Sequence, residues 1–275
     1  VSVQALSLAT LAFAACFSVW TLYSIIGIEL KERLMLSATE FGFLLAAPIL
    51  TGAIFRVPVG FFAEKVSCRN LFFWQMLLAV PPLFYLPYVE SYSGYIALGL
   101  VLGLSGVSFT IGIRYVTDWF DTKRQGFALG VFGAGNAGAA ITLVLVPFIV
   151  EAYGWQSIGH IYGVGMLVMA VLFRLLAPEI NQYYQQQQQH SLEYHLAPLK
   201  DLQVWRFGLY YYFVFGSFLA LMLWLPHYYV EAYELSLTQS LALTLLFVTS
   251  SSIVRAVGGW FADTYGARAV NWSAF

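Results

Sequence analysis

Two arginines inside long apolar runs are the side chains of this sequence best suited to bind an anion. Arg56 and Arg255 lie 199 positions apart, and each is followed by an acidic residue eight positions later and by a second arginine thirteen positions later. A guanidinium group keeps its charge at physiological pH, and at the centre of a membrane helix it costs about 2.5–3.5 kcal/mol on insertion scales. An internal repeat that carries two such side chains predicts one anion held between them.

The guanidinium group also narrows the kind of anion. It is planar and offers parallel N–H donors, so it matches the edge of an oxyanion better than an ammonium group does. Two arginines that face one another repel, and a single anion between them relieves that repulsion. Because no other basic residue lies deep within the apolar runs, a small anion suits the site better than phosphate.

The composition is typical of a membrane protein. Hydrophobic residues make up 60% of the chain and charged residues 10%, whereas soluble domains are usually about 25% charged. Apolar runs of about 18 residues or more predict spanning helices. We expect an all-α membrane protein with eight spans, at 7–30, 38–63, 70–89, 94–117, 126–150, 156–177, 205–230 and 237–262. A ninth helix is expected to start near Ala269. We expect no enzymatic activity, no cofactor and no metal site.

The distribution of basic residues predicts the orientation. With the N-terminus in the cytoplasm, Lys31 and Arg33 fall outside the cell. The basic residues that then fall in cytoplasmic loops or at their edges are Lys65, Arg69, Lys123, Arg124, Arg174, Lys200, Arg206 and Arg268. By the positive-inside rule, this excess predicts a multi-pass protein of the cell (inner) membrane with a cytoplasmic N-terminus.

A longer repeat divides the chain. The segment from Leu36 to Glu40 returns as Leu235 to Gln239, and each copy contains the Ser-x-x-Glu/Gln pattern of a capping box that opens a helix. We therefore expect a six-helix N-terminal half at 1–177, a glutamine-rich cytoplasmic linker at 178–204 and the start of a C-terminal half at 205–275. A period near 200 implies about 400 residues for two halves, so we expect a fragment that lacks the last helices.

Two turns share a spacing of glycine, acid and arginine. They are Gly60-x-x-x-Glu64-Lys65-x-x-x-Arg69 and Gly259-x-x-x-Asp263-Thr-x-Gly-x-Arg268. The spacing resembles the loop motif of the major facilitator superfamily, although Glu64 replaces Asp in the first copy and the basic residue after the acid is missing from the second. The resemblance implies the major facilitator fold, with the six-helix N-terminal half and the first two to three helices of the C-terminal half present here. It also implies a substrate site at mid-depth between the halves.

In that family this turn is a conformational latch. The resemblance assigns this role to Gly60, Glu64, Arg69, Arg114, Asp263 and Arg268. Arg114 could be a partner of Glu64, or it could pair with Asp118 at i,i+4 or extend to the surface.

A glycine-rich stretch contains a polar amide. Gly133 to Gly138 spells Gly-x-Gly-x-x-Gly, but the dinucleotide fingerprint requires a preceding strand and an acid about twenty residues later, and the sequence has Trp155 there. The stretch instead indicates a helix with one face that lacks side chains, so that another backbone or a small substrate can come close. Packing alone would explain the glycines, but it does not explain Asn136.

This stretch and three others resemble the nitrate/nitrite porter family of the major facilitators. The matching segments are Gly-Ala-Gly-Asn136-Ala-Gly138, Ser108-Phe109 with Trp119-Phe120, Gln125-Gly126 and Phe215-Gly-Ser-Phe218. The resemblance implies that Arg56 and Arg255 grip the anion and that Asn136 donates to it. It implies that the walls of the site are Phe17, Phe109, Tyr211 and Phe215.

The implied substrates fit the arginines, since nitrate is planar, singly charged and accepts hydrogen bonds in its plane. No Asp or Glu lies in the middle of any expected span, and proton-coupled carriers usually keep a carboxylate at depth. The expected function is therefore nitrate/nitrite antiport by alternating access. Proton symport, a carrier for another small or organic anion, and an anion receptor remain alternatives. The expected partners are nitrate, nitrite and the lipid bilayer; we expect a monomer that binds no nucleic acid.

Overall fold

The structure is a computed structural model that describes residues 1–179, 194 and 196–274. Eight helical segments in this part of the chain are long and apolar enough to cross a membrane. They are Ser2–Arg33, Ala38–Lys65, Cys68–Tyr88, Tyr92–Thr117, Thr122–Tyr153, Ser157–Leu176, Leu202–Tyr233 and Leu237–Tyr265. The eight predicted spans are confirmed, and most extend a few residues beyond the predicted ends. The predicted ninth helix begins at Ala267. Most of the predicted linker, including its glutamine run, lies outside the described residues.

Several spans consist of more than one helical piece. The α-helices are α1 (Ser2–Trp20), α2 (Tyr23–Arg33), α3 (Ala38–Lys65), α4 (Cys68–Tyr85), α5 (Tyr92–Leu102), α6 (Ser108–Thr117), α7 (Gln125–Gly133), α8 (Gly138–Tyr153), α9 (Ser157–Leu176), α12 (Leu202–Tyr211), α13 (Ser217–Tyr233), α14 (Leu237–Tyr265) and α15 (Ala267–Ala274). Short 3-10 pieces are η1 (Leu86–Tyr88), η2 (Gly103–Val107), η3 (Thr122–Arg124), η4 (Ala134–Ala137) and η5 (Ala197–Lys200), and η6 (Tyr212–Gly216) is π-helical.

Both predicted capping boxes are present. The Ser37 side chain accepts from the Glu40 backbone N–H and the Glu40 side chain accepts from Ser37, which starts α3. Ser236 and Gln239 make the same reciprocal pair at the start of α14. An N-cap of this kind contributes about 1 kcal/mol to a helix. The repeat therefore starts the two arginine-bearing helices in the same way.

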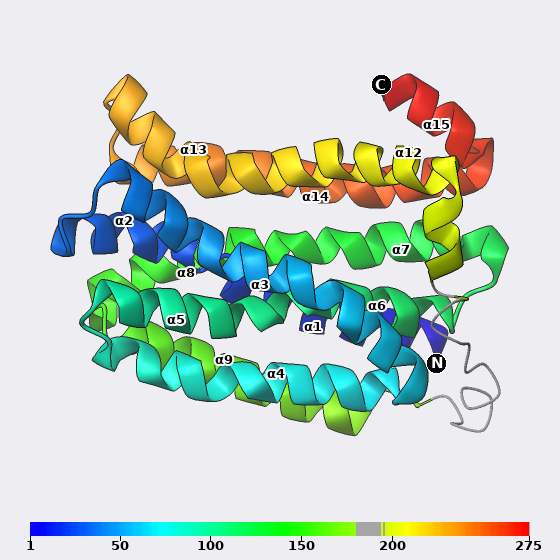
Figure 1. Ribbon diagram of the computed structural model, residues 1–275, viewed down its shortest axis with the longest axis horizontal. Coiled ribbons are helices and arrows are strands. Elements are labelled where there is room, and N and C mark those ends of the chain that lie inside the picture. The colour runs from blue at the N-terminus through cyan, green and yellow to red at the C-terminus, as the bar shows by residue number, and fades with distance from the viewer. Residues whose placement is uncertain (180–193, 195, 275) are drawn as a thin grey trace.

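The spans pack as a layered bundle with the first span at its centre (Figure 1). α1 contacts α6, α7, α8 and α9, and 78% of the most apolar window of the first span is buried. α4 and α9 pack together on one side of the bundle, while α12, α13 and α14 form the opposite side. α14 lies along α7, η4 and α8, so it is the main link between the last two spans and the first six.

Four spans are interrupted near their middles. The first has a break at Thr21 and Leu22 between α1 and α2, and the fourth, fifth and seventh contain η2, η4 and η6. Irregular backbone at membrane depth is tolerated where it is buried in protein or lines a cavity. These breaks therefore mark the level at which a polar site is expected. Below, the end of the bundle with Lys65, Gln125 and Tyr265 is called the α7 end, and the end with Arg33, Ala38 and Tyr233 is called the α2 end.

Candidate functional site

Arg56 of α3 lies among aromatic rings in the middle of the bundle. Its guanidinium carbon is 5.3 Å from the ring centre of Trp20, 5.5 Å from that of Phe109 and 5.4 Å from that of Phe215. Its Nε donates a hydrogen bond to the Gly106 carbonyl of η2 at 3.3 Å. Its Nη2 is buried and has no hydrogen-bond partner among the described residues. Cation–π contacts stabilise the charge on the ring faces, and Nη2 is left as a donor for a ligand.

Arg255 of α14 approaches the same place from the other side. Its guanidinium carbon is 5.5 Å from the ring centre of Phe215 and 5.2 Å from that of Phe218. Asn136 of η4 is fully buried. In the amide orientation that satisfies both side chains, its Oδ1 accepts from Nη1 of Arg255 at 2.9 Å and from Nη2 at 3.1 Å. Asn136 therefore orients this guanidinium group.

Phe215 connects the two arginines. Both guanidinium carbons lie within 5.5 Å of its ring centre, so they are separated by no more than twice that distance. The Tyr211 ring stacks on Phe215 at 5.1 Å and on Phe109 at 6.2 Å, and its hydroxyl is close enough to both arginines to interact with them. Two permanent cations thus share one aromatic wall, with a phenol and an amide beside them. This arrangement can hold one small anion.

Most of the predicted site residues meet here, and Phe17 is the exception. Its ring contacts those of Trp20 at 5.5 Å and Phe13 at 5.6 Å, and no cation–π contact joins it to either arginine in the described structure. Phe17 therefore packs against Trp20, and it is Trp20 that contacts Arg56. The predicted donation from Asn136 to the anion stays a prediction, because the structure shows only its contact with Arg255.

Sequence reasoning missed three groups that touch the arginines: Trp20, Phe218 and the Gly106 carbonyl. Helical spacing offered a signal for the two rings, because Trp20 is three residues after Phe17 and Phe218 is three residues after Phe215. No pattern pointed to the Gly106 carbonyl, since its availability depends on the 3-10 turn of η2.

Trp20 fits only because glycines make room for it. Its Nε1 donates to the Pro48 carbonyl at 2.8 Å. A Cβ added at Gly52 would lie 2.7 Å from that nitrogen, and one added at Gly106 would lie 2.6 Å from Cε2 of the indole. The indole therefore fills a space between α3 and η2 that is left free by the missing side chains of Gly52 and Gly106. It fixes the platform on which Arg56 rests.

The second copy of the repeated turn makes a contact between helices distant in sequence. Asp263 of α14 accepts from the backbone N–H of Gly126 at 2.9 Å and from that of Phe127 at 2.6 Å, in the first turn of α7. These N–H groups have no partners within their own helix, and the helix dipole favours a negative charge there. Asp263 thus caps α7 at the α7 end of the bundle.

The other predicted latch residues lie in α3, α4, α6 and α15, and their roles stay predictions. Arg69 makes an ion pair with Glu179 at 2.9 Å and donates to the Arg174 carbonyl. Arg114 Nε lies 3.8 Å from Asp118, which is the i,i+4 alternative. The remaining positions are Glu64 in the last turn of α3, Gly60 facing Thr110, and Arg268 in α15, where it lines a cavity with Arg206.

We expect Asp263→Asn to loosen the contact between α14 and α7. The change keeps the size of the side chain but removes its charge and one acceptor, and such caps are worth about 0.5–2 kcal/mol. Hydrogen exchange of the α7 first turn should rise about five- to thirtyfold for a loss of 1–2 kcal/mol. The measurement is hydrogen–deuterium exchange of the protein in nanodiscs, followed on peptides that cover residues 125–130.

Asp201→Asn is the matched control for this change. Asp201 caps its own helix by accepting from the Gln203 backbone N–H at 2.8 Å. Its loss should raise exchange at the start of α12 and leave the α7 peptide unchanged. Unaltered exchange of the α7 peptide in Asp263→Asn would show that the cap does not hold the two helices together.

Comparisons with known proteins agree on one family. The family model described as Major Facilitator Superfamily matches residues 8–275. A protein of Thermus thermophilus described as "Probable nitrate/nitrite antiporter NarK1" is 32% identical over 99% of this chain and 64% of its own length. The "Nitrite extrusion protein" of Bacillus subtilis is 29% identical over 94% of this chain and 65% of its own length. A protein of Staphylococcus epidermidis described as "Probable nitrate transporter NarT" is 27% identical over 96% of this chain and 68% of its own length.

A solved structure is similar in fold. The inward-facing, unoccupied structure of a bacterial homologue of the human lysosomal transporter Spinster matches with a TM-score of 0.71 at 13% identity. The match covers 97% of this chain and 64% of that one. This chain therefore spans about two thirds of the length of the proteins to which it is similar.

Proposed function

This chain belongs to the major facilitator superfamily, and from that membership we propose that the whole protein carries nitrate and nitrite across a membrane by alternating access. The predicted all-α membrane fold of this superfamily is confirmed by the family match and the similar solved structure. The observation that carries the proposal is the contact of Arg56 and Arg255 with the same ring, Phe215. The similarity to proteins named as nitrate or nitrite transporters supports the choice of substrate.

The site suits a flat monovalent oxyanion. The buried Nη2 of Arg56 has no partner among the described residues, and Asn136 already holds the donors of Arg255 in one orientation. Charge-assisted hydrogen bonds from guanidinium groups lie in the plane of the group, so they can meet nitrate or nitrite edge-on. The rings of Phe109, Phe215 and Tyr211 supply flat apolar surfaces beside that plane.

We propose that residues 1–177 and 205–275 belong to two halves that move against one another around this site, joined by the linker at 178–204. We also propose that the N-terminus faces the cytoplasm, because basic residues are concentrated at that end. The α7 end is then cytoplasmic and the α2 end faces outside. The contact of Asp263 with α7 would close the cytoplasmic side in the conformation described here.

We propose that nitrate is exchanged for nitrite, and the charges of the site support this. Without an anion the two guanidinium groups repel, and no Asp or Glu lies in the middle of the eight described spans to neutralise them. The empty site therefore reorients slowly, and the loaded site reorients readily. An anion must return for each anion that leaves.

We expect nitrate uptake into proteoliposomes to be accelerated several-fold by internal nitrite and to need no pH gradient. The measurement is the initial rate of labelled nitrate uptake with internal nitrite, formate or buffer, each with and without an imposed pH gradient. Equal acceleration by formate would point to a broader anion carrier. Uptake that requires a pH gradient and ignores internal nitrite would contradict exchange and favour proton symport.

A further inference from the structure

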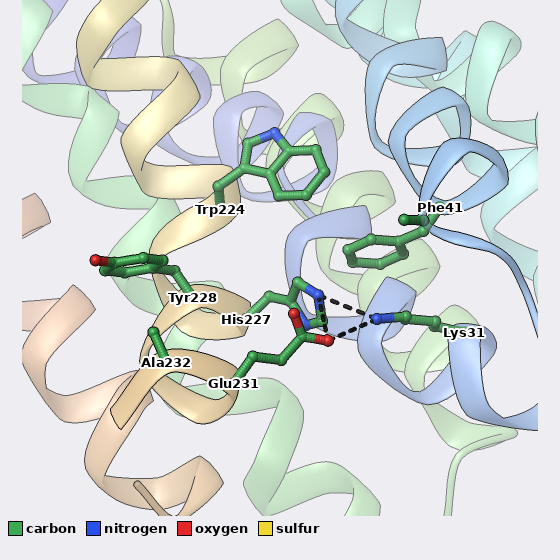
Figure 2. Close-up of a pocket in the computed structure, with 8 residues that line it drawn as sticks. Lys31, Phe41, Trp224, His227, Tyr228, Glu231 and Ala232 are labelled. Atoms are coloured by element: carbon green, nitrogen blue, oxygen red, sulfur yellow. Dashed lines mark hydrogen bonds and ion pairs between the residues drawn. The ribbon is translucent and has the colours of Figure 1, made fainter. Parts of the chain in front are cut away.

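A pocket of about 360 Å³ lies between spans at the α2 end, and among the described residues none that contacts Arg56 or Arg255 in the site above lines it. Lys31 enters it from α2, Phe41 from α3, and Trp224, His227 and Glu231 from α13 (Figure 2). α2 and α3 belong to the first two spans, whereas α13 belongs to the seventh. The pocket therefore joins the two parts of the chain that are proposed to move against one another.

Three charged or titratable groups meet at one point in this pocket. Lys31 Nζ lies 2.9 Å from Glu231 Oε1 and 3.1 Å from His227 Nε2, and His227 Nε2 lies 3.0 Å from Glu231 Oε1. Figure 2 shows the ammonium, imidazole and carboxylate groups converging in this way. A lysine ammonium group can only donate. The contact at 3.1 Å is a hydrogen bond when the imidazole ring is neutral and carries its proton on Nδ1, whereas the contact at 3.0 Å is a hydrogen bond when Nε2 carries a proton.

A proton on Nε2 of His227 changes both contacts. The ring then becomes a second cation next to Lys31 and a donor toward Glu231. The Lys31–Glu231 pair joins different spans, but the His227–Glu231 pair lies within α13 at i,i+4. Protonation thus lets an ion pair within a helix compete with the ion pair between spans for Glu231, and it adds repulsion between Lys31 and the imidazolium group.

We propose that His227 is a proton-binding site that controls closure of the α2 end, with the neutral ring holding the spans together and the protonated ring releasing them. On the orientation proposed above, acidification outside the cell opens this end toward the anion. His227 lies nine residues after Phe218 on α13, which is about 13 Å along the helix from that contact of Arg255. This proton therefore regulates access and is not itself carried with the anion.

Few charged groups surround His227 among the described residues. The pocket is lined from α2, α3 and α13, and Lys31 and Glu231 are the charged residues that line it. The Phe41 ring lies 5.0 Å from the imidazole and the Trp224 ring lies 6.3 Å away. Tyr228 adds a phenol from α13. Lys31 also sits 5.4 Å from the centre of Phe41, so the ring helps to hold the ammonium group in place.

The test measures the separation of the spans directly. Ala38 of α3 and Ala232 of α13 both line the pocket and are exposed, so cysteines there can carry spin labels. The native residues Cys16 and Cys68 are buried. The whole protein in nanodiscs is labelled at neutral pH and then equilibrated at about pH 7.5 or about pH 5, the second of which lies well below the ordinary imidazole pKa of about 6.5. Distances between the labels are measured by double electron–electron resonance.

We expect two distances between the labels, and the ratio of the population at the longer distance to the population at the shorter one should rise roughly two- to fivefold on acidification. This is the range predicted for losing one partly exposed ion pair. His227→Gln keeps a neutral acceptor for Lys31 and should give the same ratio at both pH values. Glu231→Gln removes the negative charge of the Lys31–Glu231 pair and should give the higher ratio at both pH values.

An acid response that persists in His227→Gln, or no response in the native protein, would overturn the proposal. These outcomes can be read without Glu231→Gln, should that variant fold poorly. Because the readout is a distance and needs no transported anion, the result is separate from the assignment of nitrate and nitrite as substrates.

Discussion

If the whole protein carries nitrate as proposed, replacing Arg56 or Arg255 with lysine should lower nitrate uptake by at least about a hundredfold, because each change would remove half of the proposed planar clamp. Truncating one partner of a buried, hydrogen-bonded charge pair costs about 2–5 kcal/mol, and 2.7 kcal/mol corresponds to a hundredfold change. Lysine keeps the charge but presents a compact ammonium group that cannot meet an oxyanion edge with two parallel N–H groups. The measurement is the initial rate of nitrate uptake by the full-length variants in proteoliposomes.

The two substitutions should differ in what else they disturb. Arg56→Lys removes the donor to the Gly106 carbonyl, whereas Arg255→Lys removes the two donors that the buried Asn136 oxygen accepts. A buried acceptor left without its partner costs about 1–3 kcal/mol. Arg255→Lys should therefore also lower the melting temperature of the detergent-solubilised protein more than Arg56→Lys does.

Arg206→Lys is the matched control for both variants. Arg206 is exposed near the start of α12 at the α7 end, so the substitution preserves charge without reaching the site. It should transport at close to the native rate. Retained transport in both Arg56→Lys and Arg255→Lys would rule out the planar clamp, because a positive charge at each position would then be sufficient.

The sequence predicted the parts of this molecule that depend on local pattern. Long apolar runs predicted the eight spans, and the Ser-x-x-Glu/Gln pattern predicted both capping boxes, because each of these features is set by residues close together in the chain. The repeat also identified Arg56 and Arg255 as a pair. A charge within a membrane span is so costly that its place in an apolar run is enough to indicate a functional site.

Contacts between distant spans could not be predicted in the same way. Asp263 caps a helix 137 positions earlier in the chain, and Lys31 reaches an acid 200 positions later. Nothing in the local sequence around these residues specifies their partners, which depend on how the spans pack. The interruptions at η2 and η6 were missed for the same reason, whereas the glycines of η4 were recognised as unusual. The role of Asn136 as an orienting partner of Arg255 likewise required the structure.

The glycines of the repeated turn show that its two copies act differently in this conformation. A Cβ added at Gly60 would meet only Thr110, at an ordinary 3.8 Å. A Cβ added at Gly259 would lie 2.3 Å from the Gly126 carbonyl oxygen and 3.1 Å from the Gly130 Cα. The second copy is therefore in backbone-to-backbone contact with α7, and the first copy is not in such contact with its neighbour. The cap from Asp263 follows one turn later on the same helix, so close approach and capping act together.

We expect Gly259→Ala to reduce transport about five- to thirtyfold by preventing closure of the α7 end. The atoms in the way belong to the backbone, so they cannot move aside as a flexible side chain could, and α7 and α14 must separate. Overpacking of this kind costs about 1–3 kcal/mol. A cost of 1–2 kcal/mol shifts a conformational equilibrium about five- to thirtyfold. The measurement is the initial rate of nitrate uptake, together with hydrogen exchange of the α7 first turn, which should rise.

Gly258→Ala, one residue earlier on the same helix, separates this effect from helix propensity. A Cβ at Gly258 meets nothing within 4 Å among the described residues, and the gain from replacing a helical glycine with alanine, about 1 kcal/mol, is the same at both positions. Gly258→Ala should therefore transport at close to the native rate. Equal rates in the two variants would contradict the idea that α7 and α14 must touch, because a closed α7 end that tolerates a methyl group at Gly259 cannot depend on backbone contact there.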